Sequence, residues 1–338
     1  MLSMKSVLFV YNSNAGKGLI KGKVAEIIDI FVKAGYLPTV YPTQGYKDGY
    51  KMVRHMKESY DLIVCSGGDG TLDEIVTAMV EAHIVCPLGY IPAGSTNDFA
   101  RSLHISRNLL EAADDAVNGE AFCCDIGDFN GDIFVYIAAF GMFTDVSYAT
   151  SQDVKNVLGH LAYVLEGIKR IYNIPAYNMK ITYQNKELQE MKQQRVIEGQ
   201  FIFGMVTNSK SVGGFKNIVG KEVVFDDGEF EVTLIRKPKN IIELQEIVGA
   251  LVIEQIDSKY MESFKVSSIT FESNDEVAWT LDGEYGGTHS FVKVYNRQQT
   301  LSIMVNPELG KEVDVEENAI EDEFTLEELS MKKLPYES

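Results

Sequence analysis

The 338-residue chain carries a net charge of −18, with 45% hydrophobic and 24% charged residues. This composition is typical of a soluble globular protein long enough for two domains, and its acidity argues against a nucleic-acid partner, because phosphate backbones attract basic surfaces. No apolar run reaches the roughly 20 residues that a bilayer-spanning helix needs. The start of the chain, MLSMKSVLFVYN, is interpreted as a first strand rather than a signal peptide.

Short apolar runs alternate with helix-like segments in the first part of the chain. Strands are expected at 6–12, 37–43, 61–68 and 85–94, and amphipathic helices at 19–35, 46–60 and 72–82. This alternation predicts βαβ units, in which a parallel sheet is covered by helices on both faces. Ligands of such sheets bind beyond the carboxyl ends of the strands, and the glycine-rich turns of this chain lie there.

The first of these turns, YNSNAGKG, follows the first expected strand. It lacks the G-x-x-x-x-G-K-[ST] spacing of a Walker A loop. Asn14, Gly16 and Lys17 could still form a phosphate-facing turn in which Lys17 supplies a point charge. An ordinary turn explains the same residues.

The second turn, CSGGDGTLDE, surrounds Asp69 with Gly67, Gly68 and Gly70 where a strand leads into a helix. Glycine lets the backbone approach a ligand closely, and the free amides at a helix start attract phosphate. Asp69 would repel a phosphate unless a cation mediates, so the turn predicts a nucleotide accompanied by Mg²⁺ or lysine. The plainer alternative is a strand-to-helix turn without a ligand.

The third turn, PAGSTNDFAR, ends the fourth expected strand. The polar residues 95–98 can all cap a helix that begins at Phe99, and capping alone would explain them. Three turns of phosphate-binding type at the ends of successive strands favour a shared nucleotide site.

The pattern changes near Asp125, where runs of β type joined by NG and DG turns begin. The runs at 125–141, 177–187, 199–209, 228–237, 267–273, 277–285 and 291–305 predict a mostly antiparallel β domain. Helical patterns interrupt it at 154–173 and 240–253. The four cysteines lack C-x-x-C spacing, which predicts buried free thiols and no cysteine zinc site.

Together these segments resemble the diacylglycerol kinase catalytic family, in particular its soluble bacterial lipid kinases. GGDGTLDE resembles the family's GGDGT-[LIV]-N-E, and PAGSTNDFAR resembles P-x-G-T-x-N-D-F-A-R. FCCDIGDFN, NSKSVGGF, VFDDGEFEV and LDGEYGG are similar to further family elements, so the resemblance covers residues 5 to about 305. Phosphofructokinases and NAD kinases share GGDG-T/S but lack the NDFA and LDGE elements.

The resemblance implies a fold of class α/β plus β. A Rossmann-like, parallel-sheet nucleotide domain similar to phosphofructokinase and NAD kinase would occupy residues 1–125. An antiparallel β-sandwich lipid-kinase domain would occupy 126–300, with a strand near 301–308 returning to the first domain. Residues 311–338 read as an acidic C-terminal tail, with ten acids against three lysines.

Site residues are implied by matching motif positions. The matching ATP-binding positions are Asn12, Ser13, Asn14, Ala15, Gly16, Thr43, Gly67, Gly68, Asp69, Gly70, Thr71, Leu72 and Ser95. The general base would be Glu284, and a network holding the catalytic Mg²⁺ would include Asp69, Asp98, Asp125, Lys17 and Arg101. A structural Mg²⁺ would bind the Asp227 carboxylate and the backbone carbonyls of Val224 and Glu229.

Three positions depart from the family pattern. Asp73 stands where the family usually has asparagine, Ser95 where it has threonine, and Ser13 where the N-P-x-x-G opening has proline. Asp73 adds a negative charge near the second turn, whereas Ser95 keeps the hydroxyl. None of the three changes removes a reactive group.

The expected function is therefore ATP-dependent phosphorylation of a lipid hydroxyl, that of 1,2-diacylglycerol, at the inner face of a membrane. Two alternatives are a soluble NAD-kinase-like enzyme and a non-catalytic lipid or nucleotide sensor. The partners expected are a membrane lipid and an anionic membrane surface, with a homodimer left open. The segment 154–170 combines bulky apolar residues with Lys155, Lys169 and Arg170 and is the expected docking helix, or else a cover for the β core.

Overall fold

The first part of the chain forms alternating strands and helices in the computed structural model, which describes residues 4–56, 59–141, 175–212, 215–216, 223–253 and 259–307. The elements are β1 (Lys5–Tyr11), η1 (Ala15–Gly22), α1 (Val24–Lys33), β2 (Tyr36–Pro42), α2 (Asp48–Arg54), β3 (Leu62–Gly67), α3 (Asp69–Glu81), β4 (Leu88–Pro92), α4 (Asp98–Ser102) and α5 (Leu109–Asn118). The helix expected over 19–35 is divided, because a 3-10 helix containing Gly16 and Gly18, both at positive φ, precedes α1.

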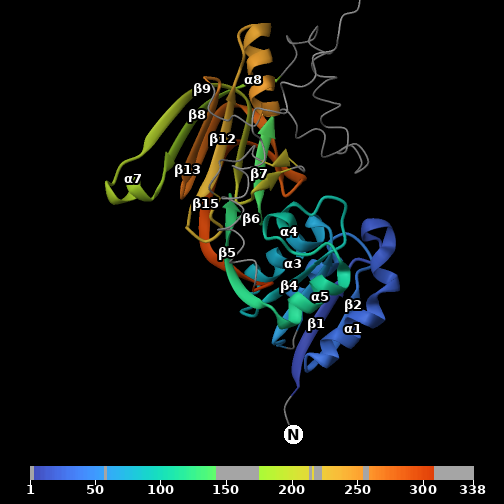
Figure 1. The fold of residues 1–338 in the computed structure, drawn as a ribbon. Helices are drawn as coiled ribbons and strands as arrows, with labels where there is room; N and C mark the ends of the chain where they lie inside the picture. The colour runs from blue at the N-terminus through green and yellow to red at the C-terminus, as the bar shows by residue number, and fades with distance from the viewer. Residues whose placement is uncertain are drawn as a thin grey trace, which may run out of the picture.

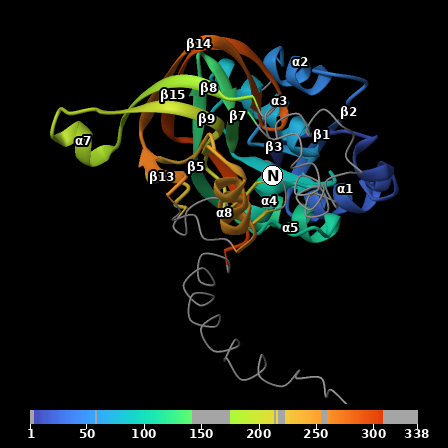
Figure 2. The same cartoon turned by 90° about the horizontal axis from the view of Figure 1, so that it is seen from above.

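The four strands β1 to β4 form a parallel arrangement in the order β2-β1-β3-β4. All six residues of β3 are buried, which fits a parallel strand covered on both faces rather than one that alternates between core and water. Helix α1 lies beside α5 (Figure 1), and α2 lies beside α3 (Figure 2). The loops that follow β1, β3 and β4 therefore leave the sheet at one edge.

The rest of the chain is mainly strands. They are β5 (Glu120–Phe129), β6 (Asp132–Phe134), β7 (Ile137–Gly141), β8 (Tyr177–Gln184), β9 (Arg195–Thr207), β10 (Ser211–Val212), β11 (Phe215–Lys216), β12 (Phe230–Arg236), β13 (Met261–Val266), β14 (Ser268–Leu281) and β15 (Glu284–Val305). The helices among them are α7 (Lys186–Glu190) and α8 (Ile241–Ile253). Except for the parallel contact between β15 and β4, the pairs recorded for these strands are antiparallel.

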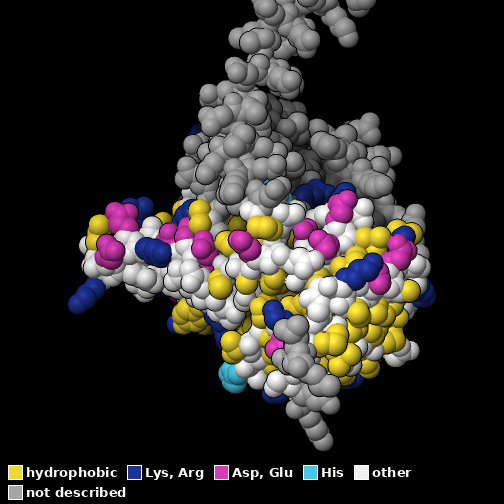
Figure 3. Space-filling model, turned by 60° about the horizontal axis from the view of Figure 1, so that its bottom comes forward, with side chains coloured by type: hydrophobic (Ala, Val, Ile, Leu, Met, Phe, Trp, Pro, Cys, Tyr) yellow, Lys and Arg dark blue, Asp and Glu magenta, His cyan; other side chains and the backbone are white. Residues whose placement is uncertain are grey.

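An arm made of β8, α7 and β9 points away from the parallel strands in both ribbon views (Figures 1 and 2). Its side chains are of mixed charge, and hydrophobic side chains gather instead on the base of the molecule beside the start of the chain (Figure 3). None of the helices in the described ranges is long and apolar enough to cross a membrane. The four cysteines are free; Cys65 and Cys124 are buried as expected, whereas Cys123 is exposed.

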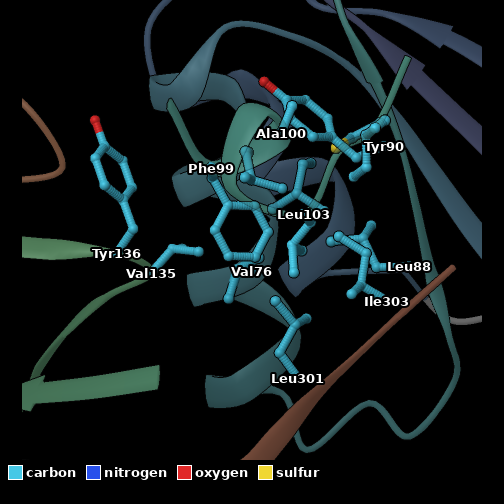
Figure 4. Packing of buried hydrophobic residues seen from close by; sticks show 14 of the residues in the cluster. Val76, Leu88, Tyr90, Phe99, Ala100, Leu103, Val135, Tyr136, Leu301 and Ile303 are labelled. Carbon is cyan, nitrogen blue, oxygen red and sulfur yellow. The ribbon is translucent and has the colours of Figure 1, made fainter. Parts of the chain in front are cut away.

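Strand β15 joins the antiparallel strands to the parallel ones. It pairs with β14 along its first part, with β5 along its later part, and in parallel with β4 through Ile303 and Leu88. The same core holds α3, α4, β4 and β15 (Figure 4). In Figure 4 the ring of Phe99 lies beside Val76 of α3, with Val135 and Tyr136 on one side and Leu301 and Ile303 beyond. All of these side chains are buried, so this cluster joins the parallel strands to part of the antiparallel ones. The antiparallel strands also hold a second, separate core around Trp279 and Phe140.

Candidate functional site

The three turns predicted from the sequence meet at the carboxyl edge of the parallel strands. The amide of Asn12, after β1, donates to the carbonyl of Ser66 in β3 at 2.8 Å, and the amide of Ala93, after β4, donates to the carbonyl of Gly67 at 2.8 Å. The Asn12 side chain also reaches Thr71 Oγ1 at 3.5 Å. The structure thus brings residues from all three turns within hydrogen-bond distance of one another.

Glycine is needed here because the turns pack closely against one another and against the start of α3. A Cβ atom on Gly16 would lie 1.9 Å from the Ala93 carbonyl oxygen, and one on Gly94 would lie 2.5 Å from the Cα of Gly68. A Cβ on Gly67 would lie 2.3 Å from Thr71 Oγ1. Only Gly16 among these has positive φ, so close approach rather than backbone conformation explains the others.

The third turn is fixed by Asn97, which lies in the left-handed region at φ 51°. Its Oδ1 accepts from the Gly94 amide at 3.0 Å, and its Nδ2 donates to the Gly94 carbonyl at 2.9 Å. The helix begins at Asp98 rather than at Phe99, and Asn97 occupies its N-cap position without a side-chain capping bond, because the Asn97 side chain binds its own turn instead. Ser95, in the same turn, is exposed.

A hairpin turn from the antiparallel strands reaches the same place. Asp282 and Gly283 connect β14 to β15 with φ of 50° and 85°, as a type I′ turn requires, and Leu281 pairs with Glu284 across it. Glu284 follows directly, and a Cβ on Gly70 would lie 2.7 Å from its Oε1. The Glu284 carboxylate thus lies against the first turn of α3.

Asp282 holds this hairpin in position. Its Oδ2 accepts from the Val135 amide at 2.5 Å, and its Oδ1 accepts from the amides of Tyr136 and Ile137 at 2.9 and 3.0 Å. The side chain is only 4% exposed, and burial raises its pKa to about 6 despite these amides. The sequence marks Asp282 as a turn residue, but no local pattern reveals partners so far away in the chain.

Negative charge accumulates around α3. Burial, with the charges of Asp98 and Asp282, raises the pKa of Asp69 to about 7, although the amides of Asp98 and Phe99 donate to it. Burial likewise raises the pKa of Asp73, with contributions from Asp282 and Glu284. Asp69 Oδ1 is buried and has no hydrogen-bond partner within the described ranges. Buried carboxyl groups this close together are stable only if a bound cation or a proton offsets part of their negative charge.

The remaining ATP-binding predictions fall near this edge. Thr43 is buried just after β2, and its amide donates to the Tyr11 carbonyl at 2.9 Å. The loop residues Ser13, Asn14 and Ala15 follow β1, where Asn14 donates its amide to Asn12 Oδ1 at 3.0 Å. Leu72 is buried in α3. Arg101 lies in α4, whereas the side chain of Lys17 is outside the described part of the structure.

Asp125 has its recorded partners in a different cluster from Asp69. One oxygen accepts from the Gly228 amide at 2.6 Å and from Asn296 Nδ2 at 3.0 Å, and the other accepts from the Gln299 amide at 2.7 Å. These contacts tie β5 to the turn at 226–228 and to the irregular part of β15. No recorded contact joins Asp125 to Asp69, Asp98 or Glu284, and its catalytic role therefore stays a prediction.

The second DG turn is the predicted structural Mg²⁺ site. Asp227 accepts from the Glu229 amide at 2.9 Å and from Lys265 Nζ at 2.9 Å. Nearby Glu231 is 3% exposed, neither of its oxygens has a hydrogen-bond partner in the described residues, and Lys265 Nζ lies 3.5 Å away. Burial raises the pKa of Glu231 to about 7.

Both clusters have donor sets that suit Mg²⁺. An orphaned buried carboxylate oxygen is present in each, on Asp69 and on Glu231. Within the described ranges no three acidic, histidine or cysteine side chains converge on one metal position. Mg²⁺ commonly uses only one or two carboxylates, with water or phosphate as its other ligands, so a single carboxylate from either cluster is enough to take part in such a site.

The model of the diacylglycerol kinase catalytic domain matches residues 6–129. A diacylglycerol kinase of Bacillus subtilis (strain 168) is 30% identical over 315 residues, covering 92% of this chain and 100% of the relative. One of Staphylococcus haemolyticus (strain JCSC1435) is 31% identical over 331 residues, covering 96% and 97%. A crystal structure named a diacylglycerol kinase, from Bacillus anthracis str. Sterne, has a TM-score of 0.68 at 21% identity and covers 91% of this chain and all of that chain. This last likeness shows the fold.

Proposed function

Because the chain belongs to the diacylglycerol kinase family, we propose that it transfers the γ-phosphoryl group of ATP to a lipid hydroxyl, that of 1,2-diacylglycerol, to give phosphatidic acid and ADP. The observation that carries this proposal is the position of the Glu284 carboxylate. It lies against Gly70, in the helix turn whose free amides suit a phosphate. A proton acceptor beside a phosphate site is what transfer to an alcohol requires.

In this mechanism the glycine turns bind the triphosphate and Glu284 acts as general base. The substrate hydroxyl loses its proton to a Glu284 oxygen as its oxygen bonds to the γ-phosphorus, and the bond to the β-phosphate oxygen breaks. ADP leaves with the electrons of that bond. Asn12 and Thr71, which already face each other, would orient the phosphates together with Ser95.

Asp69 and Asp98 would hold the catalytic Mg²⁺, with Arg101 and Lys17 as the positive groups of the same network. The ion, when bound, offsets the charge of the phosphate oxygens that develops during transfer. Asp227, with the carbonyls of Val224 and Glu229, would hold a separate structural ion that relieves the excess charge around Glu231.

We further propose that the two kinds of strand correspond to two functional parts. The parallel strands would form the Rossmann-like nucleotide domain of residues 1–125, and the antiparallel strands the β-sandwich lipid domain of residues 126–300. The position of the Glu284 hairpin supports this division, because it brings the base from the lipid side to the nucleotide side.

The lipid must be reached at a membrane surface, since diacylglycerol does not dissolve usefully in water. The segment 154–170 remains the proposed docking helix, and it lies outside the described residues. Its three basic residues would attract anionic lipids by about 1 kcal/mol each, and its apolar residues would insert.

The experiment that tests the function offers radiolabelled ATP to the protein with a panel of lipids in mixed micelles and with NAD. Labelled phosphatidic acid is the expected product. Transfer to NAD alone would favour an NAD-kinase-like enzyme, and ATP binding without any transfer would favour a sensor.

A further inference from the structure

Strand β15 contains a β-bulge a short distance after Glu284. Two pairs of residues from β14 and β15 border the bulge: Ala278 with Thr288, and Thr280 with Tyr285. Between these pairs β14 has one residue, Trp279, and β15 has two, Gly286 and Gly287. Such an extra residue bends its strand and re-aims the side chains beside it, and bulges are frequent next to active sites. The glycine pair that ends the sequence LDGEYGG forms this bulge.

The bulge decides the register of Glu284. Without the extra residue, Leu281 would pair with Tyr285, and Glu284 would lie in the connecting loop. With the bulge, Leu281 pairs with Glu284, and the loop is the two-residue turn Asp282–Gly283. Because side chains alternate between the two faces of a strand, this shift of one residue decides on which face the Glu284 carboxylate lies. The bulge therefore helps to place the carboxylate against Gly70.

Both residues of the bulge must be glycine in these surroundings. Gly287 has a φ of 93°, in the left-handed region that favours glycine, and a Cβ there would lie 2.6 Å from His289 Nε2. A Cβ on Gly286 would lie 2.6 Å from Leu281 Cγ. Two side chains thus pack directly on the bulge, and one of them belongs to the residue that pairs with Glu284.

A histidine ring fixes the bulge through a hydrogen bond. His289 Nε2 lies 3.0 Å from the carbonyl oxygen of Gly286. A carbonyl oxygen only accepts, so Nε2 carries the proton and donates it. The ring also packs edge-on against the buried ring of Phe129, with 5.4 Å between the two ring centres. The hydroxyl oxygens of Tyr285 and Thr288, which border the bulge, lie 2.5 Å apart. The bulge is thus held at its two borders and by a ring that packs on the core.

We propose that His289 is a positioning residue for Glu284. Its imidazole holds the Gly286 carbonyl and so maintains the bulge, and the bulge keeps the Glu284 carboxylate against Gly70. His289 acts through the backbone and takes no part in the proton transfer. Without its donor the bulge could shift, and a misplacement of about 1 Å can cost about 10²-fold in rate. The catalytic meaning rests on the proposed function, whereas the hydrogen bond and the bulge are properties of the folded chain.

The first test measures turnover of labelled ATP in two variants of His289. His289→Gln keeps an N–H donor, whereas His289→Met has a similar length and cannot donate. With both variants folded by circular dichroism, His289→Met should lower kcat roughly tenfold or more with little change in KM for ATP, and His289→Gln should recover most of this loss. In a Glu284→Ala background, His289→Met should cause no further loss. Equal kcat in the two variants, or an equal loss in the Glu284→Ala background, would overturn the proposal.

The second test alters the bulge itself through Gly287→Ala. Its matched control is Gly131→Ala in the turn between β5 and β6, because Gly131 has a φ of 100° and no recorded atom within 4 Å of an added Cβ apart from its chain neighbours. Both variants should lower the melting temperature, since alanine is strained in the left-handed region. Only Gly287→Ala, whose Cβ meets His289 Nε2, should also lower kcat, by roughly tenfold or more. Unchanged kcat in Gly287→Ala, or an equal fall in Gly131→Ala, would contradict the proposal.

The third test needs no activity. In ¹⁵N NMR spectra of the histidine side chains, the His289 signals are identified by their loss in His289→Gln, and Nε2 should carry a proton. A proton on Nδ1 alone would overturn the proposal. If the unmodified chain transfers no phosphate, the proposed function fails, and this measurement still decides whether the hydrogen bond to Gly286 exists.

Discussion

The substitution Gly70→Ala should displace the Glu284 carboxylate without destabilising the fold. The added Cβ would lie 2.7 Å from Glu284 Oε1, whereas non-bonded atoms settle near 3.5 Å. Apart from the adjacent residues and the backbone of α3 itself, the only other recorded atom within 4 Å of this Cβ is the Glu284 Cδ, at 3.7 Å. The end of one flexible side chain must therefore move by roughly 0.7 Å, and the backbone can stay in place.

The size of the effect follows from this displacement. A misplacement of about 1 Å can cost about 10²-fold in rate, so turnover should fall by roughly 10- to 10²-fold. The free energy of unfolding should rise although turnover falls. Gly70 lies in the first turn of α3 without a left-handed φ, and replacing helical glycine with alanine stabilises by up to about 0.5–1 kcal/mol.

Turnover would be measured with labelled ATP, stability by urea unfolding and ATP affinity by calorimetry. Gly22→Ala is the matched control, because a Cβ there meets nothing within 4 Å. In a Glu284→Ala background, Gly70→Ala should cause no further loss of turnover. An equal loss in both backgrounds, or full turnover in the single variant, would refute the role assigned to this contact.

Further predictions concern the base, the nucleotide, the second metal and the membrane. Glu284→Gln should lower turnover by about 10²–10⁴-fold with ATP affinity nearly unchanged, and wild-type turnover would contradict the general-base role. Gly68→Val should abolish ATP binding in calorimetry without altering circular dichroism, because its methyl groups would crowd the turns next to Gly94; retained affinity would place the nucleotide elsewhere. Mg²⁺ should raise the melting temperature of the unmodified chain but not of Asp227→Ala, itself destabilised by roughly 1–2 kcal/mol; insensitivity of the unmodified chain to Mg²⁺ and to chelator would argue against the site. Replacing Lys155, Lys169 and Arg170 with glutamate should reduce co-sedimentation with anionic vesicles. Equal sedimentation of this variant and the unmodified chain would show that the docking surface lies elsewhere.

The sequence was most informative where a local pattern decides the structure. Apolar runs that end in turn residues predict β1, β3 and β4 with their turns, and these strands pair in parallel as expected. The helix pattern at 240–253 matches α8 closely. In each case the period of apolar residues and the turn chemistry lie within one short window.

Contacts between distant segments could not be predicted in the same way. The three amides held by Asp282 come from residues that lie 145 to 147 positions earlier in the chain. Asp125 is predicted to belong to the catalytic network, and its sequence context did not reveal its recorded partners Gly228, Asn296 and Gln299. A side chain's type indicates what it can bind, while the tertiary fold decides which partner is near.

The parallel contact of β15 with β4 also affects how the protein is made. The strand next to β4 is among the last described parts of the chain to leave the ribosome, so β4 remains an open edge for most of synthesis. Open edges invite pairing with other chains, and contacts between distant segments form slowly. Nascent fragments that stop before residue 303 should therefore be protease-sensitive and should engage chaperones until the final strand arrives.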